Sequence, residues 1–434
     1  MRERVGGKTA LVWFERLTGF DERAASDVAG NFDVDGEWLT SRANGRRMRA
    51  GRFELPSLTE LRKRREQLWS GHVLGFNQVV ADVQALTARP ESSGATFQVA
   101  SQFNMLEMVS PNVTPESGVD GYENDHTQGP ACAIACGAGT IYRNYFVPVD
   151  GASGQTAARQ LNGFADVDAA LDVDIEVRNG YALATASQLQ SIAAQLHGAD
   201  EATRDLLMGH LRIGVQWNTE VTLADARHTV TQVYCSALPV AYTSIAAEAW
   251  EPLARLVLDA AYEATFAVAA ANAAQTGNAA LYLTMLGAGA FGNPVEWVLD
   301  AIQRARRLYA NDSLDVHVVS YGTRRSDIDA LTETAPSWTD RLFETPPHQW
   351  GNRGDPHLWR ELRAALATHP EPRSEPELAA LIARELGRLT GVDVITTTDT
   401  SVQVLRYPTA GMSGGFVSPP TWRDRIIPML TARL

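Results

Sequence analysis

One pattern, a strand, turn, helix and strand at residues 279–321, restricts the fold of this chain more than any other. Residues 279–286 are apolar and strand-like, and they run into a glycine-rich turn, Gly287-Ala288-Gly289-Ala290-Phe291-Gly292-Asn293-Pro294. Pro294 opens a helix that reaches about Leu308, and residues 314–321 form the next strand. Two strands joined by a helix in this way pair in parallel, with a right-handed crossover. The pattern therefore predicts an α/β fold.

A second strand leads into a loop rich in carboxylates, within residues 97–146. The strand begins at Phe97 and ends at Asn104, and a helix of small residues follows from about Thr127. Open α/β sheets bind ligands where a strand ends and a helix begins. We therefore expect a ligand site between this loop and the glycine-rich turn.

The chain divides into three parts. Residues 1–70 form an N-terminal extension, residues 71–323 a core with an insertion at about 148–225, and residues 324–434 a C-terminal α+β extension. A hairpin of residues 37–41 and 47–55 turns around Asn44-Gly45, a dipeptide that tolerates positive φ. Further helices are expected at residues 58–68, 187–197, 201–211, 244–273, 357–367, 375–386 and after 420, and further strands at 79–83, 213–223, 229–237, 392–397 and 401–407.

Net charge and composition argue against several classes of protein. The 434 residues carry a formal net charge of −13, which opposes general binding to nucleic acids or anionic lipids. No window approaches the ~18 apolar residues of a membrane span. Cys132, Cys136 and Cys235 have no zinc-site spacing with the histidines, and we interpret them as buried apolar residues of a cytoplasmic protein. We expect no metal ion and no cofactor.

Three acids, Asp120, Glu123 and Asp125, lie within six residues of the loop at residues 118–125, here called the acidic loop. Clustered carboxylates raise one another's pKa and can divide acid and base roles between them. The same acids could instead form a solvated turn, hold a hard cation through their oxygens, or cap the following helix. Asp125, two residues before Thr127, is well placed for capping. His126 adjoins the loop and either contacts a ligand or faces solvent.

The turn at residues 287–294, here called the glycine turn, is the other candidate ligand site. Its three glycines allow backbone N–H groups to converge without obstruction by side chains, which is one way to bind a diphosphate without lysine or arginine. A purely structural turn between strand and helix is the alternative. The ligand-binding interpretation is favoured because the strand before the glycine turn and the strand before the acidic loop are expected to belong to the same sheet.

Six short motifs, taken in order, resemble the macrodomain family. They are Ala81-Asp82-Val83, residues 99–104, residues 118–121, residues 233–239, residues 286–294 and residues 316–321. The resemblance spans roughly residues 75–322 and implies a three-layer α/β/α fold with a mixed sheet. The acidic loop is similar to that of the poly(ADP-ribose) glycohydrolase-like branch, and most of all to arginine-directed ADP-ribosylhydrolases of the MavL type.

The resemblance implies ADP-ribose, free or attached to protein, as the ligand. Asp82 would bind the adenine amine and Asn104 the distal ribose, while the glycine turn would hold the diphosphate. The remaining ligand-binding residues that it implies are Gln102, Gly118, Val119, Tyr122, Gly287, Ala288, Gly289, Ala290, Phe291 and Gly292. The activity implied is hydrolysis of the glycosidic link to protein. A non-catalytic ADP-ribose reader, or a hydrolase of another ADP-ribose-containing metabolite or nucleic acid, is the alternative.

The chemistry of such a reaction fits the acids of the loop. Cleavage at the distal ribose passes through an oxocarbenium-like centre, which needs one carboxylate to organise water and often another to handle a proton. We expect Glu123 to assist proton transfer or to position water, Asp120 to orient the ribose, and Asp125 to join them as the third acid. Carboxylates also pair well with the guanidinium of arginine.

Overall fold

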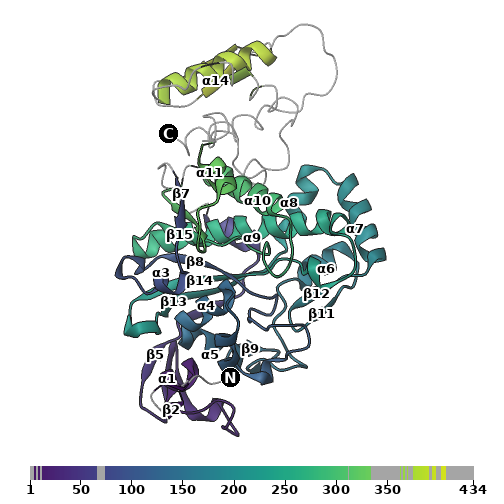
Figure 1. Cartoon of the computed structure of the whole chain (residues 1–434). Helices are drawn as coiled ribbons and strands as arrows, with labels where there is room; N and C mark the ends of the chain where they lie inside the picture. Colours follow the sequence, from purple (N-terminus) through teal and green to yellow (C-terminus); the bar gives the residue numbers. More distant parts are fainter. Residues whose placement is uncertain are drawn as a thin grey trace. The chain divides into compact units, whose positions relative to one another are not determined.

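The computed structural model describes residues 4–5, 8–9, 12–65, 74–310 and 312–333, together with residues 362, 365–366, 369, 375–390, 393–396 and 402–406. The chain splits into two compact units. One comprises Met1–Arg306 with Asp312–Thr334, and the other comprises Arg307–Asn311 with Ala335–Leu434. The first unit contains the large sheet and every candidate site residue (Figure 1).

A seven-stranded mixed sheet forms the centre of the first unit, in the order β6-β13-β14-β8-β15-β16-β7. The strands from β14 to β7 pair in parallel, and β13 pairs antiparallel with both β14 and β6. The predicted α/β fold with a mixed sheet and the parallel pairing of β15 with β16 are therefore confirmed. The strands are β6 (Arg52–Glu54), β7 (Gly75–Val80), β8 (Thr96–Ala100), β13 (Gly214–Glu220), β14 (Thr229–Cys235), β15 (Ala280–Leu283) and β16 (Asp315–Ser320).

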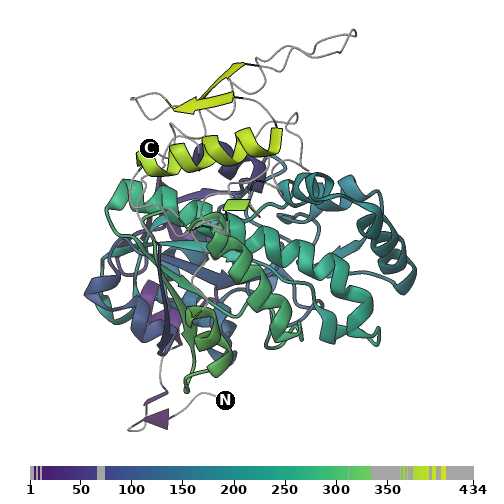
Figure 2. The same ribbon diagram turned by 90° about the horizontal axis from the view of Figure 1, so that it is seen from above.

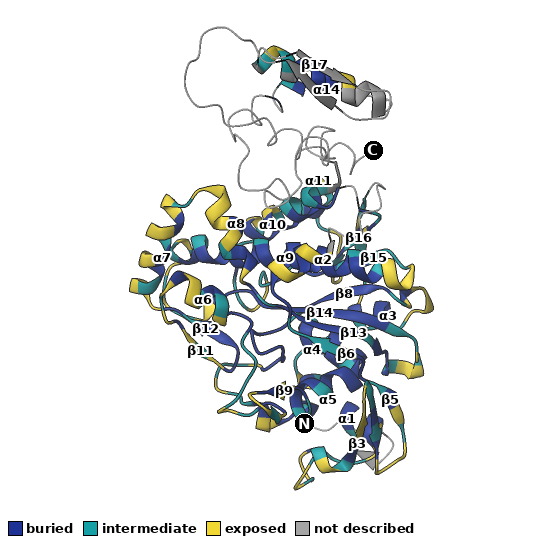
Figure 3. Cartoon of the chain, turned by 180° about the vertical axis from the view of Figure 1, so that it is seen from behind, coloured by how far each residue is buried: buried dark blue, intermediate teal, exposed yellow. Residues whose placement is uncertain are grey.

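Helices cover both faces of this sheet. The alanine-rich α9 (Ala247–Thr276) lies across β14, β8 and β15, where its small side chains allow close approach to the strands. The other face is covered by α4 (Gln128–Ala135) and α5 (Gly137–Tyr145), with α3 (Val83–Thr87) beside α4. Figures 1 and 3 show these layers from opposite sides, with β8 and β14 buried between them. The arrangement is the expected three-layer α/β/α sandwich.

The N-terminal segment contributes to the large sheet as well as to a small one. The expected hairpin exists, with β4 (Trp38–Ser41) and β5 (Arg47–Arg49) paired around Asn44-Gly45, and β3 (Phe32–Asp35) adds a third strand. The second arm, however, does not continue to residue 55. The chain turns at Gly51, whose φ is +80° and whose Cβ would meet the Trp217 carbonyl oxygen, and β6 then joins the edge of the large sheet.

Residues 148–225 also supply a strand to the large sheet, β13. Before it come β9 (Pro148–Val149), β10 (Ala152–Ser153), α6 (Ala165–Leu171), β11 (Glu176–Arg178), β12 (Tyr181–Leu183), α7 (Ala186–Gly198) and α8 (Glu201–Gly209). The two predicted polar helices are thus confirmed as α7 and α8. Both pack against α9, and Figure 2 shows the helices of this segment gathered at one side of the unit.

Three expected elements have different bounds in the structure. The strand expected at residues 79–83 is β7 and ends at Val80, because Asp82 instead caps α3 by accepting hydrogen bonds from the N–H groups of Gln84 and Ala85. The strand expected to reach Asn104 ends at Ala100. The single helix expected from Thr127 is divided into α4 and α5 at Cys136, whose φ of −117° and ψ of 58° are not helical.

A cluster of buried charges joins the helices packed behind α9. Arg62 of α2 (Leu58–Arg65) pairs with Glu263 of α9 at 2.5 Å and with Asp205 of α8 at 2.6 Å. Arg304 of α10 (Val295–Leu308) also pairs with Glu263, at 2.7 Å. These arginines lower the pKa of Glu263 to about 2 against the opposing effect of burial. The cluster is structural and lies away from the candidate site.

The second unit contains α14 (Glu375–Thr390) and an antiparallel pair of strands, β17 (Asp393–Thr396) and β18 (Val402–Arg406). These elements were predicted at residues 375–386, 392–397 and 401–407. The helix predicted after residue 420 lies outside the described residues, and so does most of the one predicted at 357–367.

Candidate functional site

A cavity of about 930 Å³ opens at the carboxyl ends of the parallel strands. Its lining comes from the ends of β7, β8 and β16, from the acidic loop with the first turn of α4, and from the glycine turn after β15. Parallel strands all end at the same edge of a sheet, and ligands in α/β folds bind at that edge. The position agrees with the one predicted from the two strand-to-helix segments.

The cavity brings together nine of the residues predicted to form the site. They are Asp82, Gln102, Glu123, Asp125, Gly287, Ala288, Gly289, Ala290 and Phe291. The described lining does not include the other six, which are Asn104, Gly118, Val119, Asp120, Tyr122 and Gly292. The glycine turn is therefore almost wholly at the cavity, whereas the acidic loop presents only part of its length.

The glycine turn is held by hydrogen bonds at its base and is open at its tip. Asn293 Nδ2 donates to the carbonyl oxygens of Leu238 (2.8 Å) and Gly287 (3.3 Å). Gly287 has a φ of +75°, and a Cβ there would lie 2.4 Å from that of Ala237. Within the described residues, the N–H groups of Gly289, Ala290 and Phe291 donate no hydrogen bond to protein. These three donors at the cavity wall suit an anion.

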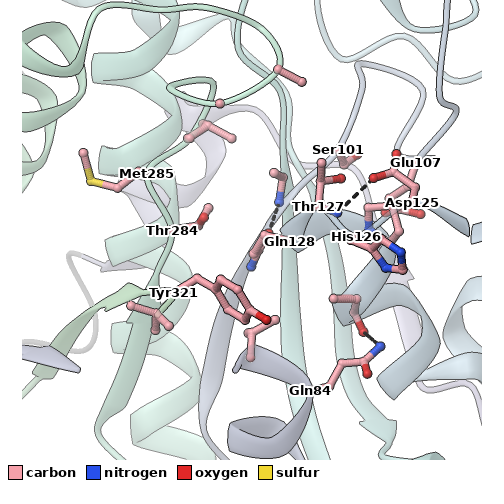
Figure 4. A pocket seen from close by; sticks show the side chains of 18 of the residues that line it. Gln84, Ser101, Glu107, Asp125, His126, Thr127, Gln128, Thr284, Met285 and Tyr321 are labelled. Carbon is pink, nitrogen blue, oxygen red and sulfur yellow. Dashed lines mark hydrogen bonds between the residues drawn. The ribbon is translucent and has the colours of Figure 1, made fainter. Parts of the chain in front are cut away.

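The opposite end of the cavity is formed by α3 and the end of β16. Asp82 is exposed there, although its Oδ1 is taken up by the N–H groups of Gln84 (2.7 Å) and Ala85 (3.2 Å). Tyr321, whose side chain is 83% exposed, stands at the same end. Figure 4 shows Tyr321 on the side of Thr284 and Met285, with Ser101, Glu107 and Asp125 on the other side of the cavity.

Each acid of the acidic loop has a structural partner. Glu123 Oε2 accepts the N–H of Trp13 at 2.9 Å, at the start of α1 (Trp13–Thr18). Asp125 Oδ1 accepts the N–H of Thr127 at 2.9 Å and so closes a turn just before α4, whose N-cap is Thr127 itself; Asp125 therefore does not cap the helix. Asp120 is buried and pairs with Arg23 at 2.7 Å. Glu123 and Asp125 are half-buried at the cavity.

The N-terminal segment holds the acidic loop in place. The buried carboxylate of Glu22 accepts the N–H groups of Val119 (2.9 Å) and Asp120 (2.6 Å), and also the hydroxyl of Tyr145 (2.8 Å). Burial raises the pKa of Glu22. A Cβ at Gly118 would lie 2.5 Å from this carboxylate, and the φ of Gly118 is +78°. Gly118 is therefore required by the close approach of Glu22.

Asn104 and Gln102 shape the turn at residues 101–108 that follows β8. Asn104 is fully buried, and its side chain accepts the N–H of Leu106 (3.1 Å) and donates to Gln160 (2.8 Å). Gln102 Oε1 accepts the N–H of Met108 at 2.7 Å. Met105, at the centre of the turn, has a φ of +63°. Because of this turn, the strand ends before Asn104, and Glu107 and Met108 line the cavity.

Glu107, which sequence reasoning missed, lies in this turn and lines the cavity although it is only 3% exposed. Its carboxylate oxygens lie 3.4 Å from Nη2 of Arg143, and its N–H donates to the hydroxyl of Tyr122 at 3.1 Å. Burial raises the pKa of Glu107 to about 7, against the opposing effect of Arg143. One acid between Leu106 and Met108 in an apolar run was the signal that could have found it.

Arg143 of α5 divides its hydrogen bonds among several partners. It is fully buried, its Nε donates to the carbonyl oxygen of Met105 at 2.9 Å, and its Nη1 donates to the hydroxyl of Tyr234. Its guanidinium also lies 3.6 Å from the centre of the Tyr234 ring, a cation–π contact. Tyr234 in turn donates to Gln232 at 2.6 Å. The network fixes the floor under Glu107.

Three aromatic rings line the cavity on the side of Glu107. Tyr181, Tyr242 and Phe291 contact one another with ring centroids 5.3 to 5.5 Å apart. The Tyr181 hydroxyl donates to the carbonyl oxygen of Met108 at 2.6 Å, so this aromatic cluster borders the residue next to Glu107. Tyr181 comes from the insertion predicted at about 148–225, Tyr242 follows the motif at residues 233–239, and Phe291 belongs to the glycine turn.

Metal-binding groups and membrane-spanning helices are both absent from the described part of the chain. It holds no group of three or more His, Cys, Asp or Glu residues placed to bind a metal ion. None of its helices is both long and apolar enough to cross a membrane. The three cysteines are buried as predicted, and burial raises the pKa of each thiol.

Comparisons with known proteins find similarity to solved structures alone. No protein-family model and no curated protein sequence matches the chain. Poly(ADP-ribose) glycohydrolase from Thermomonospora curvata is 14% identical, with 68% of this chain and 93% of that one covered and a TM-score of 0.33. The enzyme of the same name from Deinococcus radiodurans, in complex with ADP-ribose, is 11% identical, with 65% and 92% covered and a TM-score of 0.33. At such values, ligand and activity have to be inferred from the chain's own residues.

Proposed function

We propose that this chain is an ADP-ribosylhydrolase, which binds the ADP-ribose moiety of a modified protein and hydrolyses its glycosidic link. The observation that carries the proposal is that one cavity joins the free N–H groups of the glycine turn to the carboxylates of Glu107, Glu123 and Asp125. In ADP-ribose the diphosphate precedes the distal ribose, so the N–H groups would bind the diphosphate and the carboxylates would lie at the distal ribose. Five of the six motifs that resemble macrodomains also line this cavity, and the one at residues 118–121 lies outside its lining.

The nucleotide end of the ligand would lie between α3 and β16. The exposed ring of Tyr321 can stack on a base, and Asp82 can accept a hydrogen bond from an exocyclic amine through the oxygen that does not cap α3. The diphosphate would then meet the N–H groups of Gly289, Ala290 and Phe291. These contacts leave the distal ribose on the side of the carboxylates.

Hydrolysis at the distal ribose would use the two half-buried acids at the cavity wall. Glu123, fixed by the Trp13 N–H, positions the attacking water, and Asp125 faces the same space. Asp120 acts from outside the cavity by keeping the acidic loop in place through Arg23. Asn104 acts in a similar way by holding the turn at residues 101–108.

We further propose arginine as the modified residue. Tyr181, Tyr242 and Phe291 line the same cavity as the carboxyl of Glu107, and a guanidinium binds well to both aromatic rings and carboxylates. A leaving guanidine can therefore be held between the rings and the acids. The surface of the target protein around the arginine would meet the rim of the cavity.

A non-catalytic reader of ADP-ribose is the second candidate. It is favoured by the structural partners of the acidic loop, since Trp13, Thr127 and Arg23 each hold one of its carboxylates. A reader would need the glycine turn and the adenine end of the cavity. It would not need the carboxylates as chemical groups.

The test uses a peptide carrying ADP-ribose on arginine, with chromatography to measure released ADP-ribose and calorimetry to measure ADP-ribose binding. We expect release by the wild-type protein, and a loss of roughly 10²-fold in the rate with Glu123→Gln, at nearly unchanged affinity. Glu116→Gln is the matched control, because Glu116 is exposed near the acidic loop and bonds the Ala157 N–H. Binding without release from any linkage would establish a reader, and absence of binding would reject both candidates.

A further inference from the structure

Glu107 differs from the other carboxylates of the cavity in how it is held. It lies on the wall beside the aromatic cluster and is almost fully buried, yet its nearest cation is 3.4 Å away. Charge-assisted hydrogen bonds of ionised carboxylates are usually near 2.7–2.9 Å. Arg143 is shared with Met105 and Tyr234, so it compensates a negative charge on Glu107 incompletely.

We propose that Glu107 is the general acid of the hydrolysis, a role that rests on the proposed function and goes beyond it. The bond between C1 of the distal ribose and the guanidine nitrogen breaks, and its electron pair stays on the nitrogen, which takes the proton of the Glu107 carboxyl. Water adds its oxygen to C1 and releases a proton to the ionised carboxylate of Glu123. That proton returns through solvent to Glu107, so the sum of the steps is the addition of one water.

The surroundings of Glu107 keep its proton available near neutral pH. The groups that face it are Arg143 from α5, Tyr122 from the acidic loop, Tyr234 from β14 and Cys132 from α4. Only Arg143 carries a charge there, because burial raises the pKa values of Tyr122, Tyr234 and Cys132. A carboxyl that is protonated in part at neutral pH can donate a proton to a leaving nitrogen. The resulting anion is then stabilised by Arg143.

The experiment compares two leaving groups on the full-length protein. One substrate is ADP-ribose on a peptide arginine, whose guanidine is a strong base and takes up a proton as the bond to C1 breaks. The other is ADP-ribose carrying para-nitrophenol at C1, which leaves as a stable anion without a proton. Glu107→Gln is expected to slow the first reaction by roughly 10²–10⁴-fold and the second by no more than about threefold. Glu116→Gln is the control and should change neither.

The pH profile of kcat provides a second readout, which needs no variant. For the arginine substrate, the wild-type rate should fall as the pH rises through about 7, because the acid loses its proton. With the nitrophenyl substrate, this fall in kcat at high pH should be absent. This comparison keeps the assignment testable even when Glu107→Gln does not fold.

The outcomes separate the two proposals. Equal losses on both substrates, or the same falling limb with both, would show that Glu107 only supports the cavity floor and would overturn its role as the acid, with hydrolysis itself intact. A wild-type protein that is inactive on both substrates would overturn the proposed function and the role of Glu107 with it.

Discussion

The acidic loop and the turn at residues 101–108 both bring carboxylates to the cavity, but they hold them differently. Glu123 and Asp125 accept backbone N–H groups at 2.9 Å, and Asp120 is paired with Arg23 at 2.7 Å. Glu107 is almost fully buried, and besides the hydroxyl of Tyr122 it faces Arg143, which is 3.4 Å away and shared with other partners. Hydrogen bonds and ion pairs favour the ionised carboxylate, whereas burial favours the protonated one. The protonation state of a carboxyl group therefore depends more on its burial among apolar residues than on the number of acids beside it in the sequence.

Replacement of Arg143, which faces Glu107, should lower the free energy of unfolding more than any other substitution below. Arg143→Met removes the cation that faces the buried Glu107 carboxyl and one donor to the Tyr234 hydroxyl, and loss of one member of a buried pair costs about 3–5 kcal/mol. Urea unfolding measures the change in the free energy of unfolding. The matched control is Arg178→Met, because the exposed Arg178–Glu176 pair should contribute only about 0–1 kcal/mol. Equal effects of the two substitutions would mean that Arg143 does not hold the cavity floor.

The pH dependence of stability should isolate Glu107 from the acidic loop. Its pKa is about 7 in the folded protein and near 4.5 when unfolded, so the native state keeps a proton that the unfolded state has lost between these values. The contribution of Glu107 to stability is thus complete below pH 4.5 and is lost as the pH rises through about 7. Between those limits, Glu107→Gln should gain roughly 3 kcal/mol over the wild type in the free energy of unfolding. A difference that does not vary with pH would contradict the raised pKa.

Substitutions at two glycines of the glycine turn, Gly287 and Gly289, can distinguish an effect of backbone strain from an effect on ligand binding. Gly287→Ala places a Cβ 2.4 Å from that of Ala237 at a φ of +75°, so we expect a stability loss of about 1–3 kcal/mol and weaker ADP-ribose binding. At Gly289, which lines the cavity, a Cβ would meet no atom within 4 Å. Gly289→Ala should leave the melting temperature nearly unchanged. A weaker affinity there, measured by calorimetry, would then report contact with the ligand rather than a damaged turn.

The sequence was sufficient for the parallel strands of the central sheet and for the edge of the sheet at which the cavity opens. The βαβ pattern at residues 279–321 requires parallel strands, and parallel strands end at one edge, so the glycine turn and the acidic loop had to meet. It was not sufficient for the contacts of individual acids. Glu22 and Trp13 lie about a hundred residues from the loop that they hold, and no local pattern reveals such a pairing. Glu107 was missed for a local reason: the strand was predicted to reach Asn104, whereas β8 ends at Ala100 and the chain turns before Glu107.

The smallest expected effect on stability belongs to Asp125→Asn, and it tests the acidic loop most directly. An asparagine side chain still accepts the Thr127 N–H through its oxygen, so the melting temperature should change little, whereas Asp125→Ala should cost about 1 kcal/mol by losing that hydrogen bond. The negative charge at the cavity is lost in both variants. If Asp125 acts as a carboxylate in hydrolysis, both variants lose a similar part of kcat on the arginine substrate. If it only holds the start of α4, Asp125→Asn retains the wild-type kcat and Asp125→Ala alone is impaired, which would leave Glu107 and Glu123 as the pair that performs the reaction.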